Sequence, residues 1–333
     1  MKPAQGNEHR KDNGGNDEGF TSVFRGSDRF SSRFPSWRRE FLKPRSNTRP
    51  SDNSIMTSAR SVFILLCGFS ALLVFNGCLT ANSNLNASDD LSSHLQLLID
   101  EAEAGDPGVQ YYLGWMYEHE RHEPQSNYEA ARWYRLAADQ GYEDAMYRLG
   151  VLFDRGEGVG QDLGKAAYWY RRGGEAGDAR SQYNLALMYD FGEGVERDQT
   201  EAARWYRKAV KQGYAPAQNN LGVLYAVGEG VDVNSAEAVR WYRNAAEQHY
   251  ARAQYNLGMM YYYGRSVRQS FVEAYAWCYL SMANGGNPEA LRHIVPHLNR
   301  DQVRQGLLRA GELQRELRTP WMREDSAPDE PEL

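Results

Sequence analysis

Two pairs of histidines have the spacing of metal ligands. His119 and His122 are separated by two residues, and His293 and His297 by three, and both spacings occur in metal sites. The first pair lies in an irregular loop, however, and Pro296 interrupts the second. We therefore expect exposed histidines at these positions and no bound metal.

A cysteine and several glycines suggest two further kinds of chemistry. Cys278 stands where four other copies of a repeated pattern carry tyrosine, which favours a small apolar thiol over a nucleophile. Gly-Glu-Gly-Val segments begin at Gly156, Gly192 and Gly228, but no Lys-Ser or Lys-Thr follows them and no strand is expected before them, as a phosphate loop requires. Ser, His and Asp are not grouped at a catalytic spacing. The sequence therefore predicts a protein that is not an enzyme and uses no cofactor.

The elements that carry these residues repeat every 36 residues. Tryptophan occupies one position of the repeat in five copies, at Trp133, Trp169, Trp205, Trp241 and Trp277. A leucine, an aromatic and an alanine position keep the same period, and the apolar residues between Ala130 and Ala138 follow the i, i+3, i+4 spacing of one helical face. The pattern predicts two helices in each copy, with the tryptophan, leucine and alanine positions in the core.

Signals for helix ends recur with the same period. The position before the second helix holds a residue that can cap an N-terminus, at Ser126, Asp162, Asp198, Asn234 and Ser270. A glutamate follows three residues later in four copies, which predicts a capping box. The same helix is expected to end at Gly141, Gly177, Gly213 and Gly285, and only His249 departs from glycine.

These motifs resemble those of Sel1-like repeat proteins, which are relatives of the tetratricopeptide arrays. The resemblance lies in Arg-Ser-Gln-Tyr-Asn-Leu at 180–185, in the Tyr-x-x-Gly-Glu-Gly-Val loop and in Glu-Ala-Ala-Arg-Trp-Tyr-Arg at 201–207. It implies an all-α fold, an α-solenoid of helix-turn-helix repeats with capping helices at both ends. Some secreted relatives carry a cysteine pair in each repeat and are linked to binding of cell-wall or antibiotic-like ligands, but this chain lacks those pairs.

The predicted domain plan has six parts. They are a disordered N-terminal extension (1–55), which precedes a possible true start at Met56; a signal peptide or membrane anchor (56–77); a linker with a degenerate half-repeat (78–105), in which Leu97 takes the tryptophan position; five repeats (106–286); C-terminal capping helices (287–318); and a disordered acidic tail (319–333).

The segment from Met56 to Cys78 predicts export. An apolar run from Val62 to Phe75 follows Arg60 and is too short to span a bilayer. The Gly77-Cys78 junction resembles a bacterial lipobox, which implies lipidation of Cys78, while ordinary cleavage nearby and an uncleaved anchor stay open. We predict a location on the periplasmic side of the cell envelope, anchored by lipid, with secretion or a single membrane span as alternatives.

The predicted binding surface lies on the first helix of each pair, which lines the concave face in tetratricopeptide arrays. Its candidate residues are Tyr111, Tyr147, Tyr183, Asn184, Asn219, Asn220, Tyr255 and Asn256. Tyrosine offers contact area at low entropic cost, and a row of asparagines can pair with an extended peptide. The alternative is that the tyrosines pack between repeats and the asparagines bond the neighbouring repeat.

An arginine stripe on the second helices also has two interpretations. It consists of Arg135, Arg171, Arg207 and Arg243, reinforced by Arg132, Arg204 and Arg240. The stripe either accepts carboxylates of an acidic peptide or polysaccharide or forms a solvated face that bridges to the glutamate positions.

The partner class follows from charge and resemblance. The net charge is −6, and acidic residues outnumber basic ones beyond Cys78, so nucleic acid is an unsuitable ligand. The resemblance implies a non-enzymatic scaffold or regulator that binds another protein of the bacterial envelope, for example in exopolysaccharide assembly or receptor signalling. The alternative is a secreted or periplasmic module that binds cell-wall glycan or peptide, or a host-contact factor. Membrane contact is expected only through the N-terminal lipid or anchor.

Overall fold

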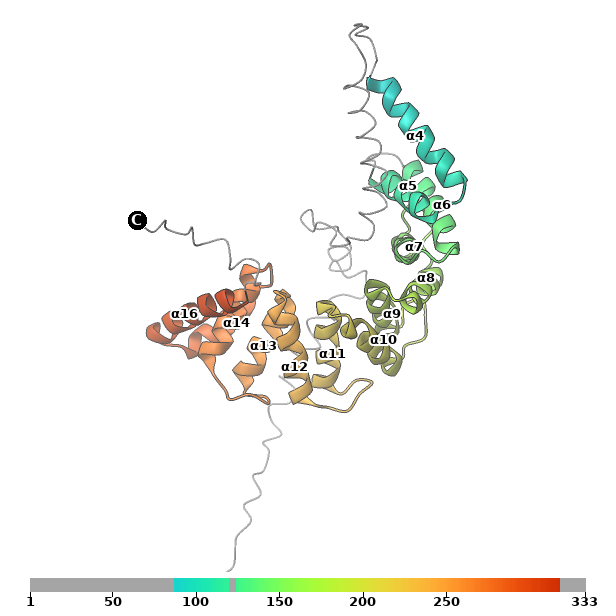
Figure 1. The fold of residues 1–333 in the computed structure, drawn as a ribbon. Helices are drawn as coiled ribbons and strands as arrows, with labels where there is room; N and C mark the ends of the chain where they lie inside the picture. The colour runs from blue at the N-terminus through green and yellow to red at the C-terminus, as the bar shows by residue number, and fades with distance from the viewer. Residues whose placement is uncertain (1–86, 120–123, 318–333) are drawn as a thin grey trace, which may run out of the picture. The chain divides into compact units, whose positions relative to one another are not determined.

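The structure is a computed structural model that describes residues 87–119 and 124–317 (Figure 1). These residues form thirteen α-helices and one 3₁₀-helix, and none of them lies in a β-strand. The expectation of an all-α fold is therefore confirmed. The segments predicted at 1–55, 56–77 and 319–333 lie outside the described residues. The chain divides into two compact units, with the boundary between Ser181 and Gln182.

The first unit contains helices α4 to α8 and the first residues of α9. Their bounds are α4 (Ala87–Glu103), α5 (Pro107–His119), α6 (Pro124–Asp139), α7 (Glu143–Arg155), α8 (Leu163–Ala176) and α9 (Ala179–Phe191). Helix α5 packs against α6 and α7 against α8, so each pair is one repeat, and α6 packs against α7 between repeats. Consecutive helix pairs therefore stack as the 36-residue period predicts.

The second unit continues from Gln182 to the C-terminal helix. Its further elements are α10 (Gln199–Lys211), α11 (Ala215–Val227), α12 (Ser235–Glu247), α13 (Ala251–Tyr263), α14 (Phe271–Ala283), α15 (Glu289–Ile294), η1 (Val295–His297) and α16 (Arg300–Glu316). Helix α14 packs on both α13 and α16. Helix α15 ends at Ile294, just before Pro296, and one 3₁₀ turn that contains this proline follows.

Polar side chains begin most of the second helices, as the sequence predicts. The side chains of Asp162, Asp198, Asn234 and Ser270 each accept a hydrogen bond from a backbone N–H of the first turn. The position of Ser126 was predicted wrongly, because α6 begins two residues earlier at Pro124, a residue well suited to a first turn.

The predicted capping boxes are replaced by ion pairs. The glutamates at the third helical position bind arginine instead of the cap backbone: Glu201 pairs with Arg204, Glu237 with Arg240 and Glu273 with Arg309. A reciprocal capping box is present at Asn299 and Gln302, at the start of α16.

Left-handed residues end the helices at the predicted places. Gly141, Gly177, Gly213 and Gly285 all have positive φ. His249, which replaces glycine in the fourth repeat, has φ 61° and so adopts the same conformation with a side chain.

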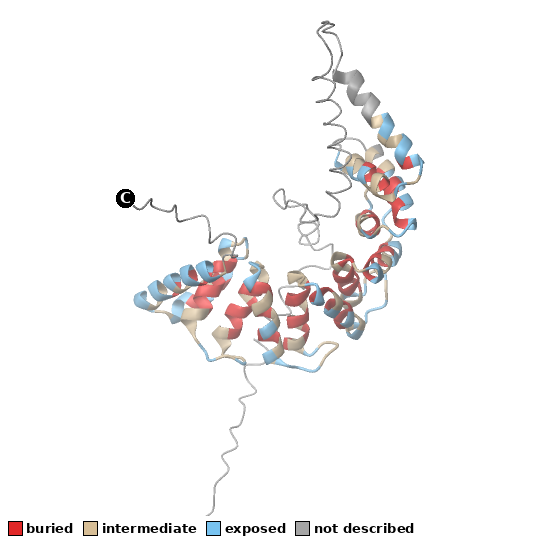
Figure 2. Ribbon diagram, viewed as in Figure 1, coloured by how far each residue is buried: buried red, intermediate tan, exposed pale blue. Residues whose placement is uncertain are grey.

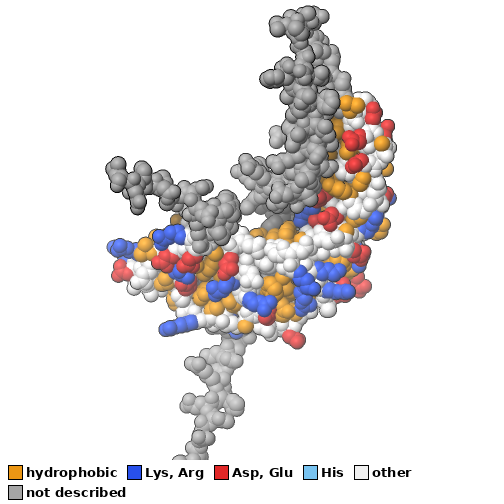
Figure 3. All heavy atoms as spheres, viewed as in Figure 1, with side chains coloured by type: hydrophobic (Ala, Val, Ile, Leu, Met, Phe, Trp, Pro, Cys, Tyr) orange, Lys and Arg blue, Asp and Glu red, His pale blue; other side chains and the backbone are white. Residues whose placement is uncertain are grey.

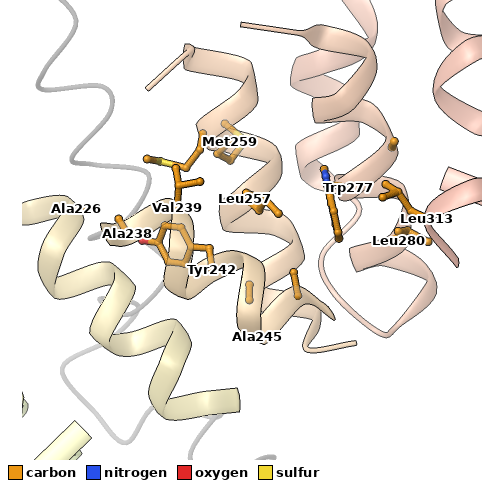
Figure 4. Packing of buried hydrophobic residues seen from close by; sticks show 14 of the residues in the cluster. Ala226, Ala238, Val239, Tyr242, Ala245, Leu257, Met259, Trp277, Leu280 and Leu313 are labelled. Atoms are coloured by element: carbon orange, nitrogen blue, oxygen red, sulfur yellow. The ribbon is translucent and has the colours of Figure 1, made fainter. Parts of the chain in front are cut away.

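The repeated aromatic and alanine positions form the core (Figure 2). Trp133, Trp169, Trp205 and Trp277 are buried as predicted, whereas Trp241 is half-buried. In the second unit, one apolar cluster runs from Ala226 of α11 to Leu313 of α16 (Figure 4). The tryptophan and alanine positions therefore act mainly in packing, as the sequence predicts.

Glycine allows the two helices of a pair to approach closely. A Cβ at Gly114, Gly150 or Gly222 would lie within 2.8 Å of the ring of Tyr134, Tyr170 or Tyr242, respectively. In the fifth repeat, Cys278 replaces the tyrosine, and its Sγ lies over Gly258. The prediction of a buried thiol at this position is confirmed, because Cys278 is 1% exposed.

Helix α4 covers the first repeat in a register different from the expected one. Leu97, which was predicted to take the tryptophan position, is exposed, whereas Leu95, Leu98 and Ile99 pack against Ala102 and Trp133. Within residues 87–119 and 124–317, no helix combines the length and hydropathy that a membrane span requires.

Candidate functional site

In the first unit, the candidate site is the surface formed by the first helices of its repeats, α5, α7 and the start of α9. We call this surface the first-helix face. Tyr111 on α5 packs against Tyr134 and Tyr142, with ring centroids 5.6 and 5.1 Å apart. Tyr147 lies one repeat later on α7, 6.3 Å from Tyr170. Both candidate tyrosines are half-buried, and burial raises the pKa of each phenol.

An arginine and a glutamate join α5 to α7 on this face. Arg148 donates to Glu118 at 3.3 Å, and the Tyr134 hydroxyl donates to the same carboxylate at 2.5 Å. Burial alone would lower the pKa of Arg148, but the charge of Glu118 keeps that pKa above its ordinary value. The guanidinium is thus a fixed cation whose side chain is 23% exposed.

A second arginine joins α7 to the start of α9. Arg180 forms ion pairs with Asp144 and, at 2.7 Å, with Asp178. Its guanidinium also lies 4.4 Å from the centre of the Tyr147 ring, a cation–π contact. Asp144 and Asp178 are 13% and 7% exposed, whereas Arg180 is 37% exposed. The groups that this face offers to solvent are therefore mainly cationic and aromatic.

In the second unit, the first helices are joined by amides. Asn256 donates to Asn219 at 2.9 Å, Asn219 to Asn220 at 3.0 Å, and Asn220 to the Tyr206 hydroxyl at 3.2 Å. Asn219 and Asn256 are each 3% exposed. This chain of hydrogen bonds links α13 to α11 inside the protein, since buried amides require partners.

The predicted peptide-binding residues thus fall into two groups. Tyr183, Asn219 and Asn256 are buried and so are not open to a peptide. The two asparagines bond between repeats, as the alternative proposes, whereas Tyr183 packs against Tyr206 and Tyr214 of its own repeat. The five that retain exposed surface are Tyr111, Tyr147, Asn184, Asn220 and Tyr255. Tyr255 packs between two core clusters, and burial raises its pKa to about 12. Binding by any of these residues stays a prediction.

The arginine stripe is engaged in contacts within the chain. Arg132, Arg204 and Arg240 each pair with the glutamate three residues before them, as in the solvated interpretation. Arg207 and Arg243 donate to tyrosine hydroxyls 18 residues later, at 3.2 and 3.0 Å. A surface reserved for an acidic polymer is therefore not favoured along the whole stripe.

The histidines and the cysteine of the sequence analysis lie apart. His119 is exposed and its Nδ1 contacts the Trp115 carbonyl, while His122 lies outside the described residues. His293 is exposed, and Nε2 of His297 contacts the Tyr262 hydroxyl at 2.9 Å. Burial raises the pKa of the Cys278 thiol to about 12. Across the part of the chain that the structure describes, no three metal-ligating side chains gather.

A set of glutamines, which are not among the predicted site residues, ties the helices together. Gln140 donates to Gln110, Gln212 to Gln182, Gln248 to Gln218, and Asn284 to Gln254, each across 30 residues. Gln110 and Gln254 also donate to carbonyls eight residues before them, in the preceding repeat. The signal was present in the sequence, because four glutamines recur at multiples of 36 residues.

The fold and these repeated contacts define the class of protein as an α-solenoid built from helix-pair repeats. The Sel1 repeat pattern matches residues 107–142, 143–178, 179–214, 215–250 and 251–285, more than half of the chain. The chain belongs to the Sel1 repeat family. Proteins with Sel1 repeats generally act in protein–protein interaction and are typically non-catalytic.

Two solved structures show how far the likeness extends. One is a protective antigen of uropathogenic Escherichia coli with an SLR fold; it is 33% identical over 71% of this chain, with a TM-score of 0.62. This chain spans about half of that protein, 52% of its length. The other is a Sel1 repeat protein from Oxalobacter formigenes, 28% identical over 67% of this chain and 92% of that protein, with a TM-score of 0.56. A search of curated proteins gave no match.

Proposed function

We propose that this protein is a scaffold or regulator that binds another protein through the first-helix face of residues 107–181. The observation that carries the proposal is the arrangement of Arg148 and Arg180 beside Tyr111 and Tyr147. Arginine and tyrosine contribute a large share of binding energy at protein interfaces. Here both arginines are already held by carboxylates, so binding orders few additional side chains.

The exposed groups of this face indicate the chemistry of the partner. Arg180 is more exposed than the carboxylates that hold it, and Tyr147 lies beneath its guanidinium. A partner surface that presents a carboxylate next to an apolar side chain would match both groups. We therefore expect an acidic, partly apolar segment of the partner at this place.

We further propose that the partner belongs to the bacterial cell envelope. The support is the sequence from Met56 to Cys78, which has the order of an export signal with a lipid-accepting cysteine. Mass spectrometry of the natively exported protein would then find a lipid on an N-terminal Cys78. An unmodified, intact N-terminus on a cytoplasmic protein would contradict the envelope location.

Crosslinking in the native host tests the binding face. Arg180→Gln removes the cation, and we expect at least a tenfold loss of the crosslinked partner, since a charge-assisted hydrogen bond is worth about 1.5–3 kcal/mol. Arg132→Gln is the matched control, because Arg132 is 54% exposed on a second helix and its contacts, an ion pair with Glu129 and a cation–π contact with Trp133, are with residues of the same helix. Equal recovery of the partner with both variants would show that the face is assigned wrongly.

A folding control separates loss of binding from loss of structure. Arg180→Lys keeps the positive charge but loses the bidentate geometry of the guanidinium, so this variant should bind the partner with intermediate affinity. Circular dichroism should report the same helicity for the two substitutions at Arg180 and for the natural protein. Sedimentation of the protein with purified cell wall, without any protein partner, would favour the glycan-binding alternative instead.

A further inference from the structure

A cavity lies in the second unit, where the fifth repeat meets the C-terminal helix. Its volume is about 500 Å³. The lining includes Arg243 of α12, Tyr261 of α13, Arg268 of the following loop, Glu273 of α14 and Arg309 of α16. The buried ring of Trp277 forms an apolar part of the lining. The cavity is large enough for a small molecule.

The lining carries three arginines and one carboxylate. Arg309 donates to Glu273 at 3.0 Å, and Arg243 donates to the Tyr261 hydroxyl at 3.0 Å. Arg268 is exposed, and no hydrogen bond or ion pair connects it to another described residue. Arg309 also pairs with Glu312 and Glu316, at 3.3 and 3.2 Å, so the positive charge of the lining resides on Arg243 and Arg268. Of these two, Arg268 has the guanidinium that is available for a ligand.

The positive charge is particular to this repeat. One repeat earlier, 36 residues before, the positions of Arg268 and Arg309 are held by Asp232 and Glu273. Of the three arginines that line the cavity, only Arg243 has an arginine at the corresponding position of the preceding repeat, which is Arg207. Packing of the repeat thus does not require the two additional cations. Figure 3 shows Lys and Arg side chains spread among apolar ones on the visible face of this unit.

The start of α14 adds to the positive electrostatic potential of the cavity. Ser270 lines the cavity and caps α14, so the positive end of that helix dipole lies at the cavity wall. Guanidinium groups and a helix start both favour a group with two or more anionic oxygens.

We propose that this cavity binds the carboxylate or phosphate group of a small anionic ligand. Arg268 and Arg243 hold the anionic oxygens, and Trp277 contacts the apolar part of the ligand. Arg309 is a positioning residue that holds Glu273 at the cavity wall, because its Nε donates to Glu273 and its Nη1 to Glu312 and Glu316. This site lies on other helices than the first-helix face, so it is independent of the proposed function.

Titration with simple anions tests the site. Sodium phosphate and sodium acetate are added to the full chain at constant ionic strength, and the arginine Nε–H signals are followed by NMR. We expect saturable shifts at Arg243 and Arg268 with at least one anion. Saturation by phosphate alone would assign a phosphate ligand, and saturation by acetate would assign a carboxylate. A failure of both anions to saturate would overturn the proposal.

A charge-matched pair of variants removes the effect of general electrostatics. Arg268→Asp introduces the residue that the preceding repeat carries, and should weaken anion binding about tenfold or more. Arg204→Asp makes the same charge change at a side chain that is 68% exposed on α10 and does not line the cavity. It should leave affinity within about twofold. Equal weakening by the two variants would show that the anions respond only to net charge.

Discussion

At the scale of single residues, His249 carries backbone strain that its counterparts avoid. It ends α12 with φ 61°, where the other repeats use glycine. An L-residue in this conformation costs about 1–2 kcal/mol, which is partly offset because glycine is more flexible when unfolded. We expect His249→Gly to raise the free energy of unfolding by about 1 kcal/mol in a denaturant titration. Lys211→Gly, inside the end of α10, should lower it; a decrease for both would contradict the prediction.

Gly230 is required for a different reason, because the backbone of the neighbouring repeat approaches it closely. It has φ 68°, and a Cβ there would lie 2.1 Å from the Gln199 carbonyl oxygen, near the start of α10. Gly213 has φ 76° and open space around it. Both alanine substitutions introduce left-handed strain, but only Gly230→Ala also forces two repeats apart. We expect its unfolding free energy to fall below that of Gly213→Ala by about 1–3 kcal/mol. Equal values would mean that the loop moves freely.

At the scale of helices, we expect that a glutamine pair can be replaced by two apolar residues only if both members change together. Gln248→Ala removes the donor to buried Gln218 and should cost about 1–3 kcal/mol. The second repeat carries Met146 and Ala176 at the corresponding positions. Adding Gln218→Met to Gln248→Ala should therefore restore most of the lost stability. A double-mutant cycle measures this coupling, and additive losses would contradict it.

The sequence predicts the helices well because their signals are local. A cap such as Asp198, a stop such as Gly213 and the period of the tryptophans act within one turn or one repeat. The burial of Asn219 and Asn256 was not predictable in the same way, because an asparagine on the first helix suits either water or a neighbouring amide. The Glu273 to Arg309 ion pair was also missed, since it depends on how α16 packs on α14.

The candidate site was predicted only in part for the same reason. The positions of Tyr111 and Tyr147 follow from the period, but their charged neighbours come from other helices. Asp144 and Arg180 are 36 residues apart, a spacing that could have revealed the pair. A repeat position that holds different residue types is harder to recognise than the tryptophan position. The ion pairs of Arg148 and Arg180 are therefore seen only in the three-dimensional structure.

At the scale of the whole molecule, loss of packing in one repeat of a stacked array also destabilises the neighbouring repeats. Trp205 is 4% exposed, and its indole N–H has no hydrogen-bond partner among the described residues. Trp205→Ala therefore loses packing and a cation–π contact with Lys208, whose Nζ lies 3.5 Å from the ring centre. We expect a loss of about 3–5 kcal/mol and faster amide hydrogen exchange in α10, α11 and α12. Trp241→Ala removes a half-buried ring and should cost less. Unchanged exchange in Trp205→Ala would show that the repeats unfold independently.

The constant separation of the contacts has a genetic consequence. The glutamine pairs join residues 30 apart, and two links between first helices, Asn219 to Asn256 and Asp144 to Arg180, join residues 37 and 36 apart. Loss of residues 215–250 by unequal recombination would remove one full period and keep the pairs Gln182 to Gln212 and Gln254 to Asn284. A gene for such a chain can therefore change its copy number without breaking these two pairs, whereas a deletion that is not a multiple of 36 residues would break the register.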